Sequence, residues 1–164
     1  LAKCKLSIMN KTGGLVLDYM RSVENVGSIF RTAEGLGVSK IYLIGTTPTP
    51  LDRFGRKRSD MAKVALGAEE ILEWEYRENL VEVLNELKSQ NFQIISLEQS
   101  EKSHDLKSFK PRDMFALVVG NEVDGVSKEA LEMSDEIVEI EMRGKKESLN
   151  VSVSTGIALY ESLK

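Results

Sequence analysis

Short apolar runs alternate with amphipathic stretches along most of the chain. Four runs carry the β-branched and aromatic residues typical of strands, at residues 15–18, 40–45, 92–97 and 114–120. The last run is continuously apolar, which is typical of a strand that helices cover on both faces. Residues 71–76 form a weaker strand candidate. Residues 136–142 alternate Ile and Val with acids, as a strand near the edge of a sheet does.

The stretches between these strands favour helices. Helices are predicted at residues 25–35, 79–89, 127–133 and 150–164. Asn25, Ser127 and either Ser148 or Asn150 are placed to cap the free N–H groups of helix starts. Polar, aperiodic residues predict loops at 46–60 and 100–112. With no internal repeat or linker, the alternation predicts one α/β domain over residues 1–164, a mainly parallel sheet flanked by helices.

Composition places the chain among globular proteins, with 41% hydrophobic and 29% charged residues. No apolar run approaches the roughly 20 residues that cross a bilayer, so no membrane partner is expected. The first residues lack a long apolar core with a cleavage site, so no signal peptide is expected. Cys4 is the only cysteine, which excludes an internal disulfide and a cysteine metal cluster. These features predict a cytoplasmic protein.

Charge is unevenly distributed. The net charge of −4 taken alone argues mildly against a nucleic-acid partner. However, one loop segment gathers Arg53, Arg56, Lys57, Arg58 and Lys63, and another gathers Arg143, Lys145 and Lys146. A charge run is more often a solvated face than a binding site. Two basic clusters in glycine-containing loops nevertheless favour an anionic ligand modestly.

Three polar, glycine-marked segments follow or flank the apolar strands, at residues 25–31, 120–125 and 147–152. Ligands of open parallel sheets bind at the carboxyl ends of the strands. Asn25 and Arg31 lie roughly 9 Å apart along one helix, so both side chains can approach one site. Glu122 follows the most buried strand, where a carboxylate favours an arginine partner. Each segment also has a purely structural interpretation, as a helix cap or tight turn, and the pattern alone leaves both open.

Other chemistries have little support in the sequence. The only histidine, His104, lies beside Asp105 in a polar loop and is interpreted as a surface residue. With one histidine and one cysteine, no metal site is predicted. A nucleophile elbow, a Walker phosphate loop and the Gly-x-Gly-x-x-Gly dinucleotide fingerprint are all absent from the sequence.

Together the three segments resemble the three motifs of the SpoU family, the 2′-O-ribose RNA methyltransferases of the SPOUT superfamily. The motifs are N-V-G-S-I-F-R-T-A-E-G-L-G, L-V-V-G-N-E-V-D-G-V-S and K-K-E-S-L-N-V-S-V-S-T-G-I-A-L-Y-E, and the match runs from about residue 15 to 163. The resemblance implies a SPOUT fold with a C-terminal trefoil knot. It also implies a homodimer, an RNA substrate and S-adenosylmethionine bound in a bent conformation.

The resemblance also assigns site residues. It implies catalytic and substrate-positioning roles for Asn25, Arg31, Glu122, Ser148 and Asn150. Backbone groups of knot loops hold the adenosine part of the cofactor in the family, which maps to Leu97, Gly120, Ile140 and Leu149. Two positions depart from the pattern, since Glu141 stands where relatives often have Pro and Arg143 where many have His. Both adjoin the cofactor loop and bear on cofactor affinity.

The proton of the ribose hydroxyl is the remaining chemical problem. Family proposals make the Arg31 equivalent the general base, but a guanidinium pKa above about 12 makes a neutral arginine costly. We therefore favour Arg31 as an electrostatic stabiliser of the developing alkoxide. Glu122 is expected to orient Arg31 or Asn25, and Ser148 with Asn150 to fix the motif loops. The residues expected to contact RNA are Arg53, Arg56, Lys57 and Arg58.

Three other functions stay open at this point. A knotted methyltransferase can act on a base nitrogen instead of a ribose, and a related scaffold can serve as a non-catalytic RNA-binding or ribosome-assembly factor. A generic nucleotide-binding α/β protein would explain the sheet but not the three motifs. The sequence does not distinguish transfer RNA from ribosomal RNA as the substrate.

Overall fold

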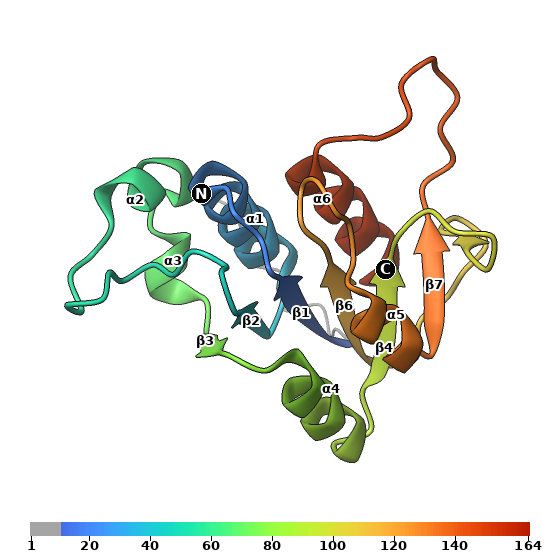
Figure 1. Cartoon of the computed structure of the whole chain (residues 1–164), viewed down its shortest axis with the longest axis horizontal. Coiled ribbons are helices and arrows are strands. Elements are labelled where there is room, and N and C mark those ends of the chain that lie inside the picture. The colour runs from blue at the N-terminus through green and yellow to red at the C-terminus, as the bar shows by residue number, and fades with distance from the viewer. Residues whose placement is uncertain (1–10) are drawn as a thin grey trace, which may run out of the picture.

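A seven-stranded sheet forms the centre of the molecule, in the strand order β3-β2-β1-β6-β4-β7-β5 (Figure 1). The computed structural model describes residues 11–164, so Cys4 and the segment tested for a signal peptide lie outside the described residues. Every neighbouring pair of strands is parallel. The strands are β1 (Thr12–Asp18), β2 (Lys40–Ile44), β3 (Trp74–Arg77), β4 (Gln93–Leu97), β5 (His104–Asp105), β6 (Met114–Val119) and β7 (Glu136–Glu139).

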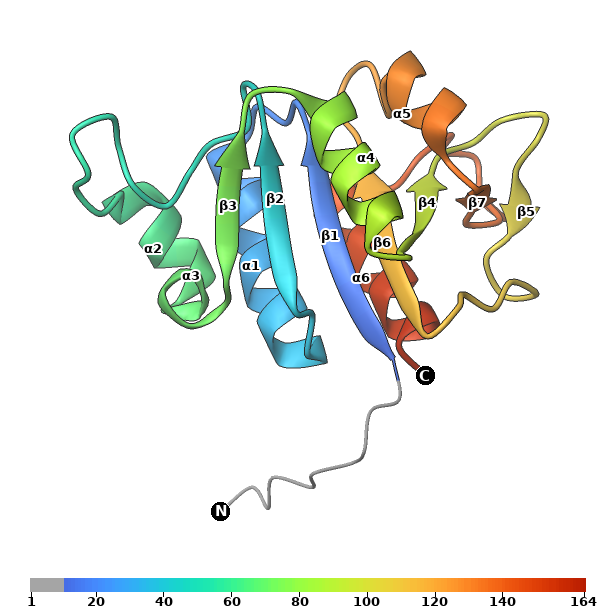
Figure 2. The same ribbon diagram turned by 90° about the horizontal axis from the view of Figure 1, so that it is seen from below.

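Helices cover both faces of this sheet (Figure 2). One face is covered by α1 (Val23–Leu36), α2 (Ser59–Ala65), α3 (Ala68–Ile71) and α6 (Val151–Ser162). The other face is covered by α4 (Leu80–Ser89) and α5 (Lys128–Met133). The predicted fold class, a parallel sheet flanked by helices, is confirmed. The trefoil knot stays a prediction.

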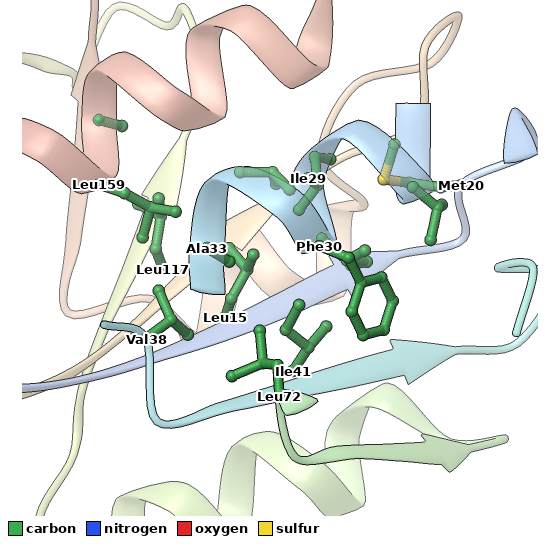
Figure 3. Close-up of a cluster of buried hydrophobic side chains, with 14 of the residues drawn as sticks. Leu15, Met20, Ile29, Phe30, Ala33, Val38, Ile41, Leu72, Leu117 and Leu159 are labelled. Atoms are coloured by element: carbon green, nitrogen blue, oxygen red, sulfur yellow. The ribbon is translucent and has the colours of Figure 1, made fainter. Parts of the chain in front are cut away.

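The side-chain alternation of the strands separates the two hydrophobic cores. In β1, Leu15 and Leu17 point to the α1 side, whereas Val16 points to the α4 side. All three are fully buried, which is why this central strand carries no polar alternation. Figure 3 shows the larger core, in which Phe30 of α1 packs over Ile41 of β2. Full burial of such a side chain contributes about 1.5–3 kcal/mol.

Helix starts differ from the predictions in an informative way. Helix α1 begins at Val23, and its cap is the Ser22 hydroxyl, which accepts the Asn25 N–H at 3.1 Å. The prediction that Asn25 caps this helix is therefore wrong, and its side chain is available for other contacts. Ser127 and Asn150 do cap α5 and α6, as predicted.

Three elements were not predicted. The N-cap residues of α2 and α3 are Arg58 and Gly67, and neither makes a side-chain cap, so the usual start signal is missing. Ile71 ends α3 instead of starting a strand, and β3 begins only at Trp74. The two-residue strand β5 lies within the predicted loop 100–112, which makes β7 the second strand from the edge.

The buried end of β1 anchors the opposite helix layer. Asp18 is buried, and its Oδ2 accepts the Ser127 N–H at 2.7 Å, which ties β1 to the start of α5. Burial raises the pKa of the Asp18 carboxyl, although hydrogen bonds from Ser127 oppose this shift. Its Oδ1 has no hydrogen-bond partner among residues 11–164.

Among the described residues 11–164, no helix combines the length and the apolar character that a membrane crossing requires.

Candidate cofactor-binding and catalytic site

A cavity of about 680 Å³ lies at the carboxyl ends of β4, β6 and β7, where parallel-sheet proteins bind ligands. Its size is in the range of small-molecule and cofactor sites. The loops that follow these strands form its wall, together with the start of α6. The wall contains every position expected to hold the cofactor, namely Leu97, Gly120, Ile140 and Leu149.

Two glycines allow the backbone to close one side of this cavity. Gly120 and Gly125 lie at the two ends of a tight loop, in which Asn121 and Gly125 exchange backbone hydrogen bonds of 2.9 and 3.0 Å. A Cβ at Gly120 would overlap the carbonyl group of Gly125. Gly125 has a φ of 72°, the left-handed region that favours glycine. A side chain at either position would therefore move the loop that lines the cavity.

Glu98 is a cavity residue that the sequence analysis missed. Its Oε2 accepts the Val126 N–H at 2.9 Å, and its Oε1 accepts the Gln99 N–H at the same distance. The carboxylate therefore fastens the loop after β6 to the loop after β4. The available signal was its place directly after an apolar strand, the same signal that identified Glu122.

Glu122 is the centre of a hydrogen-bond network at the rim of the cavity. Its Oε2 accepts the Arg21 N–H at 3.1 Å, and its Oε1 accepts the Ser22 N–H at 2.9 Å and the Asn25 amide at 3.2 Å. The Asn25 amide oxygen in turn accepts the Asn150 amide at 3.1 Å. Residues from all three sequence segments are thus linked directly. Glu122 was expected to orient either Arg31 or Asn25, and in the structure it accepts a hydrogen bond from Asn25.

The electrostatics of Glu122 follow from these donors. Partial burial alone would raise the pKa of its carboxyl. The backbone N–H groups of Glu122 itself, Ser22 and Arg21, with the Asn25 amide, outweigh that effect and hold the pKa below its ordinary value. Glu122 is therefore a carboxylate at neutral pH, and it fixes which end of the Asn25 amide is the donor.

The third segment holds the other side of the rim. Asn150 caps α6, since its Oδ1 accepts the Ser152 N–H at 2.9 Å and the Ser152 hydroxyl at 2.6 Å. These contacts leave the Asn150 amide N–H free to donate to Asn25. Ser148 lines the cavity beside Leu149. The network can position a hydroxyl-bearing substrate at the mouth of the cavity through amide groups.

Arg31 has a different location. It is exposed on α1 and is not one of the residues that line the cavity. The next residue, Thr32, contacts Gly156 of α6 and lines a shallow groove with it. Within one subunit, Arg31 is therefore separate from the network of Asn25, Glu122 and Asn150.

The two departures from the family pattern pair with each other. Arg143 donates to Glu141 at 2.9 Å, and both side chains are exposed. The cavity is lined instead by the alternate residues Ile140 and Met142. The two unusual residues therefore belong to the outer side of the cofactor loop, away from the cavity wall.

The basic loop segment is largely neutralised by acids of its own region. Arg56 pairs with Asp52, Lys57 with Glu70, and Arg58 with Asp60. Arg53 is the member of the predicted RNA-contacting set for which residues 11–164 provide no ion pair. The segment is therefore less positive than its sequence indicates.

Comparison with known proteins agrees with this arrangement. Residues 14–160 match the model of the SpoU rRNA Methylase family. The chain is 33% identical over 150 residues to the 23S rRNA (guanosine-2′-O-)-methyltransferase RlmB of Vibrio parahaemolyticus, covering 92% of this chain and 58% of that protein. The Neisseria meningitidis RlmB is 36% identical over 148 residues, covering 90% and 56%. The chain belongs to the SpoU rRNA methylase family, and it spans little more than half the length of these curated relatives.

Solved structures share the fold. A TrmH/SpoU tRNA modifying enzyme from A. aeolicus superposes with a TM-score of 0.81 at 31% identity, covering 93% of this chain and 74% of that one. An AdoMet-bound rRNA methyltransferase from Sinorhizobium meliloti has a TM-score of 0.82 at 24% identity, covering 92% and 55%. The first of these agrees with the family assignment, and the second supports the fold alone.

Proposed function

We propose that this chain transfers a methyl group from S-adenosylmethionine to a ribose 2′-hydroxyl of ribosomal RNA. The observation that carries the proposal is the hydrogen-bonded set of Asn25, Glu122 and Asn150 at the rim of the cavity. The curated relatives named RlmB, 33–36% identical to this chain, favour ribosomal over transfer RNA. That substrate favours a cytoplasmic location.

The cavity suits the proposed cofactor. The loop between Gly120 and Gly125 lines the cavity, and its backbone is folded so tightly that neither glycine has room for a Cβ. Leu97, Ile140 and Leu149 supply apolar surface and backbone groups around that loop. When bound, S-adenosylmethionine supplies an activated sulfonium methyl group. The protein then has to position the ribose and stabilise its oxygen, and alignment of this kind lowers a barrier by several kcal/mol.

The residues of the site have different roles in positioning the ribose and stabilising its oxygen. Glu122 holds the Asn25 amide in one orientation, and Asn150 holds its oxygen. Asn25 and Ser148 face the mouth of the cavity and position the ribose hydroxyl there. Arg31 stabilises the negative charge that develops on the 2′-oxygen as its proton passes to water, and S-adenosylhomocysteine would be left once the methyl group has been transferred. A guanidinium can do this without losing its own proton.

Arg31 can act in this way if the protein is a homodimer. Helix α6 carries the exposed apolar side chains Val153, Ile157 and Tyr160, which border a groove against Thr32 of α1. We propose that a second copy covers this surface, since a patch of this kind marks an interface. Arg31 precedes Thr32 directly, so it lies at the border of this surface and reaches the cavity of the partner.

Methylation of ribosomal RNA tests the proposal directly. Purified protein is incubated with S-adenosylmethionine and unmodified ribosomal RNA, and the digested nucleosides are analysed by mass spectrometry. The proposal expects a 2′-O-methyl nucleoside that is absent after Asn25→Ala. A methyl group on a base nitrogen would assign the chain to the other kind of knotted methyltransferase. No methyl transfer, together with retained RNA binding, would favour a non-catalytic RNA-binding factor.

A further inference from the structure

A second cavity, of about 550 Å³, lies beside the connection between β2 and α2. Two exposed aromatic side chains line it, Phe54 in the connection and Tyr76 on β3. Phe54 is 66% exposed and Tyr76 is 47% exposed. Most of its lining residues belong to the loop that follows the carboxyl end of β2, and Figure 2 shows this loop extending past the edge strand β3. The proposed methyl transfer does not account for these aromatic residues.

Two arginines lie close to the ring of Phe54. The guanidinium carbons of Arg53 and Arg56 are 4.7 and 5.0 Å from the centre of its ring. Contacts of this length are attractive, because the face of an aromatic ring is electronegative. The ring is thus part of a cationic and aromatic surface, the combination with which proteins bind single-stranded nucleic acid.

Local hydrogen bonds hold the Phe54 turn in place. Asp52 Oδ1 accepts the Phe54 N–H at 2.8 Å and the Arg56 N–H at 3.0 Å. The Asp52 N–H donates to the Arg56 carbonyl at 2.8 Å, and Gly55 completes the turn with a φ of 75°. A turn that is already ordered loses less conformational entropy when a ligand binds. Arg56 is tied to Asp52, so Arg53 is the cation of this turn that can bind a phosphate.

Hydrogen bonds connect this surface to the catalytic network. Thr47, which lines the aromatic cavity, accepts the Met20 N–H at 3.0 Å through its hydroxyl oxygen. The next two residues, Arg21 and Ser22, donate their N–H groups to Glu122. One RNA strand can therefore contact both the aromatic cavity and the network around Glu122 along the same edge of the sheet.

We propose that the surface formed by Arg53, Phe54 and Tyr76 binds an unpaired nucleotide of the RNA substrate. The base stacks on Phe54, with Tyr76 bordering it, and Arg53 contacts a phosphate. Bases of single-stranded RNA can be stacked on aromatic side chains, whereas bases within a duplex are covered by their neighbours. This inference rests on the proposed function, because it assumes an RNA substrate.

The test compares a labelled, unstructured oligoribonucleotide with a blunt RNA duplex of the same length, by fluorescence anisotropy. Phe54→Leu should weaken single-strand binding about tenfold and leave duplex binding unchanged, since the substitution removes the stacking of one base. Phe54→Trp should retain single-strand binding. Arg53→Gln should reduce the slope of log affinity against log salt by about one. Ile71→Ala, an exposed apolar residue on α3, is the matched control and should change neither affinity.

The outcomes separate this inference from the proposed function. Unchanged single-strand binding by both Phe54→Leu and Tyr76→Leu, with a wild-type protein that binds RNA, would overturn only the nucleotide surface. Equal losses for single strand and duplex would also overturn it, because they would show backbone contacts without stacking. A wild-type protein that binds neither RNA would contradict the proposed substrate itself. Calorimetric titration with S-adenosylmethionine checks that each variant is folded, since this surface lies outside the cofactor cavity.

Discussion

At the scale of single residues, the site depends on the orientation of a few amide groups. An Asn amide has one accepting and one donating end, and the Glu122 carboxylate together with the Asn150 amide fixes both ends of Asn25. Because Glu122 also accepts two backbone N–H groups, it joins the loop after β1 to the loop after β6. The proposed mechanism therefore requires a negative charge on Glu122.

Replacing this carboxylate by an amide tests that requirement. Glu122→Gln places an NH₂ group against N–H donors, so Asn25 loses its fixed orientation. We expect methyl transfer to fall by about tenfold or more, because a hydrogen bond to a charged group contributes about 1.5–3 kcal/mol. The affinity for S-adenosylmethionine should change little. Equal losses in transfer rate and cofactor affinity would show that Glu122 acts on the cofactor cavity instead.

Glu122 also predicts a dependence of stability on pH. Its pKa is lower in the folded protein than its ordinary value of 4.5, so the unfolded chain binds more protons in the window between the two. The contribution of Glu122 to the free energy of unfolding is complete above pH 4.5 and is lost as the pH falls through the folded pKa. Urea unfolding of wild type and Glu122→Gln at several acidic pH values measures it. A constant difference across that window would contradict the lowered pKa.

Asp18 predicts the opposite dependence of stability on pH. Its pKa is raised by burial, so the folded protein becomes less stable, relative to the unfolded chain, as the pH rises from 3.8 through the folded pKa. Asp18→Asn keeps an acceptor for the Ser127 N–H and removes this ionisation. We expect its thermal midpoint to exceed that of wild type by about 3 °C at neutral pH and to match it in acid. A lower midpoint at neutral pH would show that the ionised carboxylate stabilises α5.

At the scale of elements, the predictions depended on local signals. The continuously apolar strands and the amphipathic α4 were predicted because burial patterns are visible within a few residues. Helices α2 and α3 are short and lack side-chain caps, so their positions depend on packing against α1. For the site, spacing indicated three segments, but the cofactor positions followed from the resemblance. Phe54 was missed because no local pattern distinguishes it from ordinary loop residues, whereas Glu98 was missed although it directly follows an apolar strand, as Glu122 does.

The sequence analysis overestimated the positive charge of the loop between β2 and α2. Neutralising Arg56, Lys57 and Arg58 together should weaken RNA binding and lower its salt slope by about one, less than three free cations would. Fluorescence anisotropy across a salt series measures the slope. Lys107→Gln with Lys110→Gln is the control, since both residues are exposed in the segment after β5, the edge strand at the other end of the sheet from β3. RNA binding that is unchanged by the triple substitution would remove this loop from the RNA-binding surface.

At the scale of the whole molecule, the proposed homodimer would complete the proposed site. Arg31 does not line the cavity of its own chain, so in the proposed mechanism it acts at the cavity of a second copy. Residue spacing could not predict that Arg31 acts at the cavity of a second copy, because spacing along a helix gives no information on a second chain. We expect Ile157→Asp to convert a dimer to a monomer in analytical ultracentrifugation, and Ile71→Asp, exposed on α3, to leave the dimer intact. A monomeric wild-type protein would contradict the dimer.

Mixing two inactive variants tests whether Arg31 acts across the dimer. In a heterodimer of Arg31→Ala and Asn25→Ala subunits, one site has an intact Asn25 and receives an intact Arg31 from the partner. Random exchange makes about half of the dimers heterodimers, each with one of two sites restored, so about a quarter of wild-type activity should return if each site works independently. No recovery, with exchange verified by mass spectrometry, would place Arg31 in the site of its own subunit.

The central claim is that the loops after β4, β6 and β7 enclose an S-adenosylmethionine site. Calorimetric titration of the purified protein with S-adenosylmethionine and S-adenosylhomocysteine tests it most directly. We predict binding of about one ligand per subunit, lost in Gly120→Ala because the added Cβ displaces the Gly125 loop, whereas Gly55→Ala in the loop between β2 and α2 keeps it. A folded protein that binds neither ligand, alone or with bulk RNA, would contradict the claim.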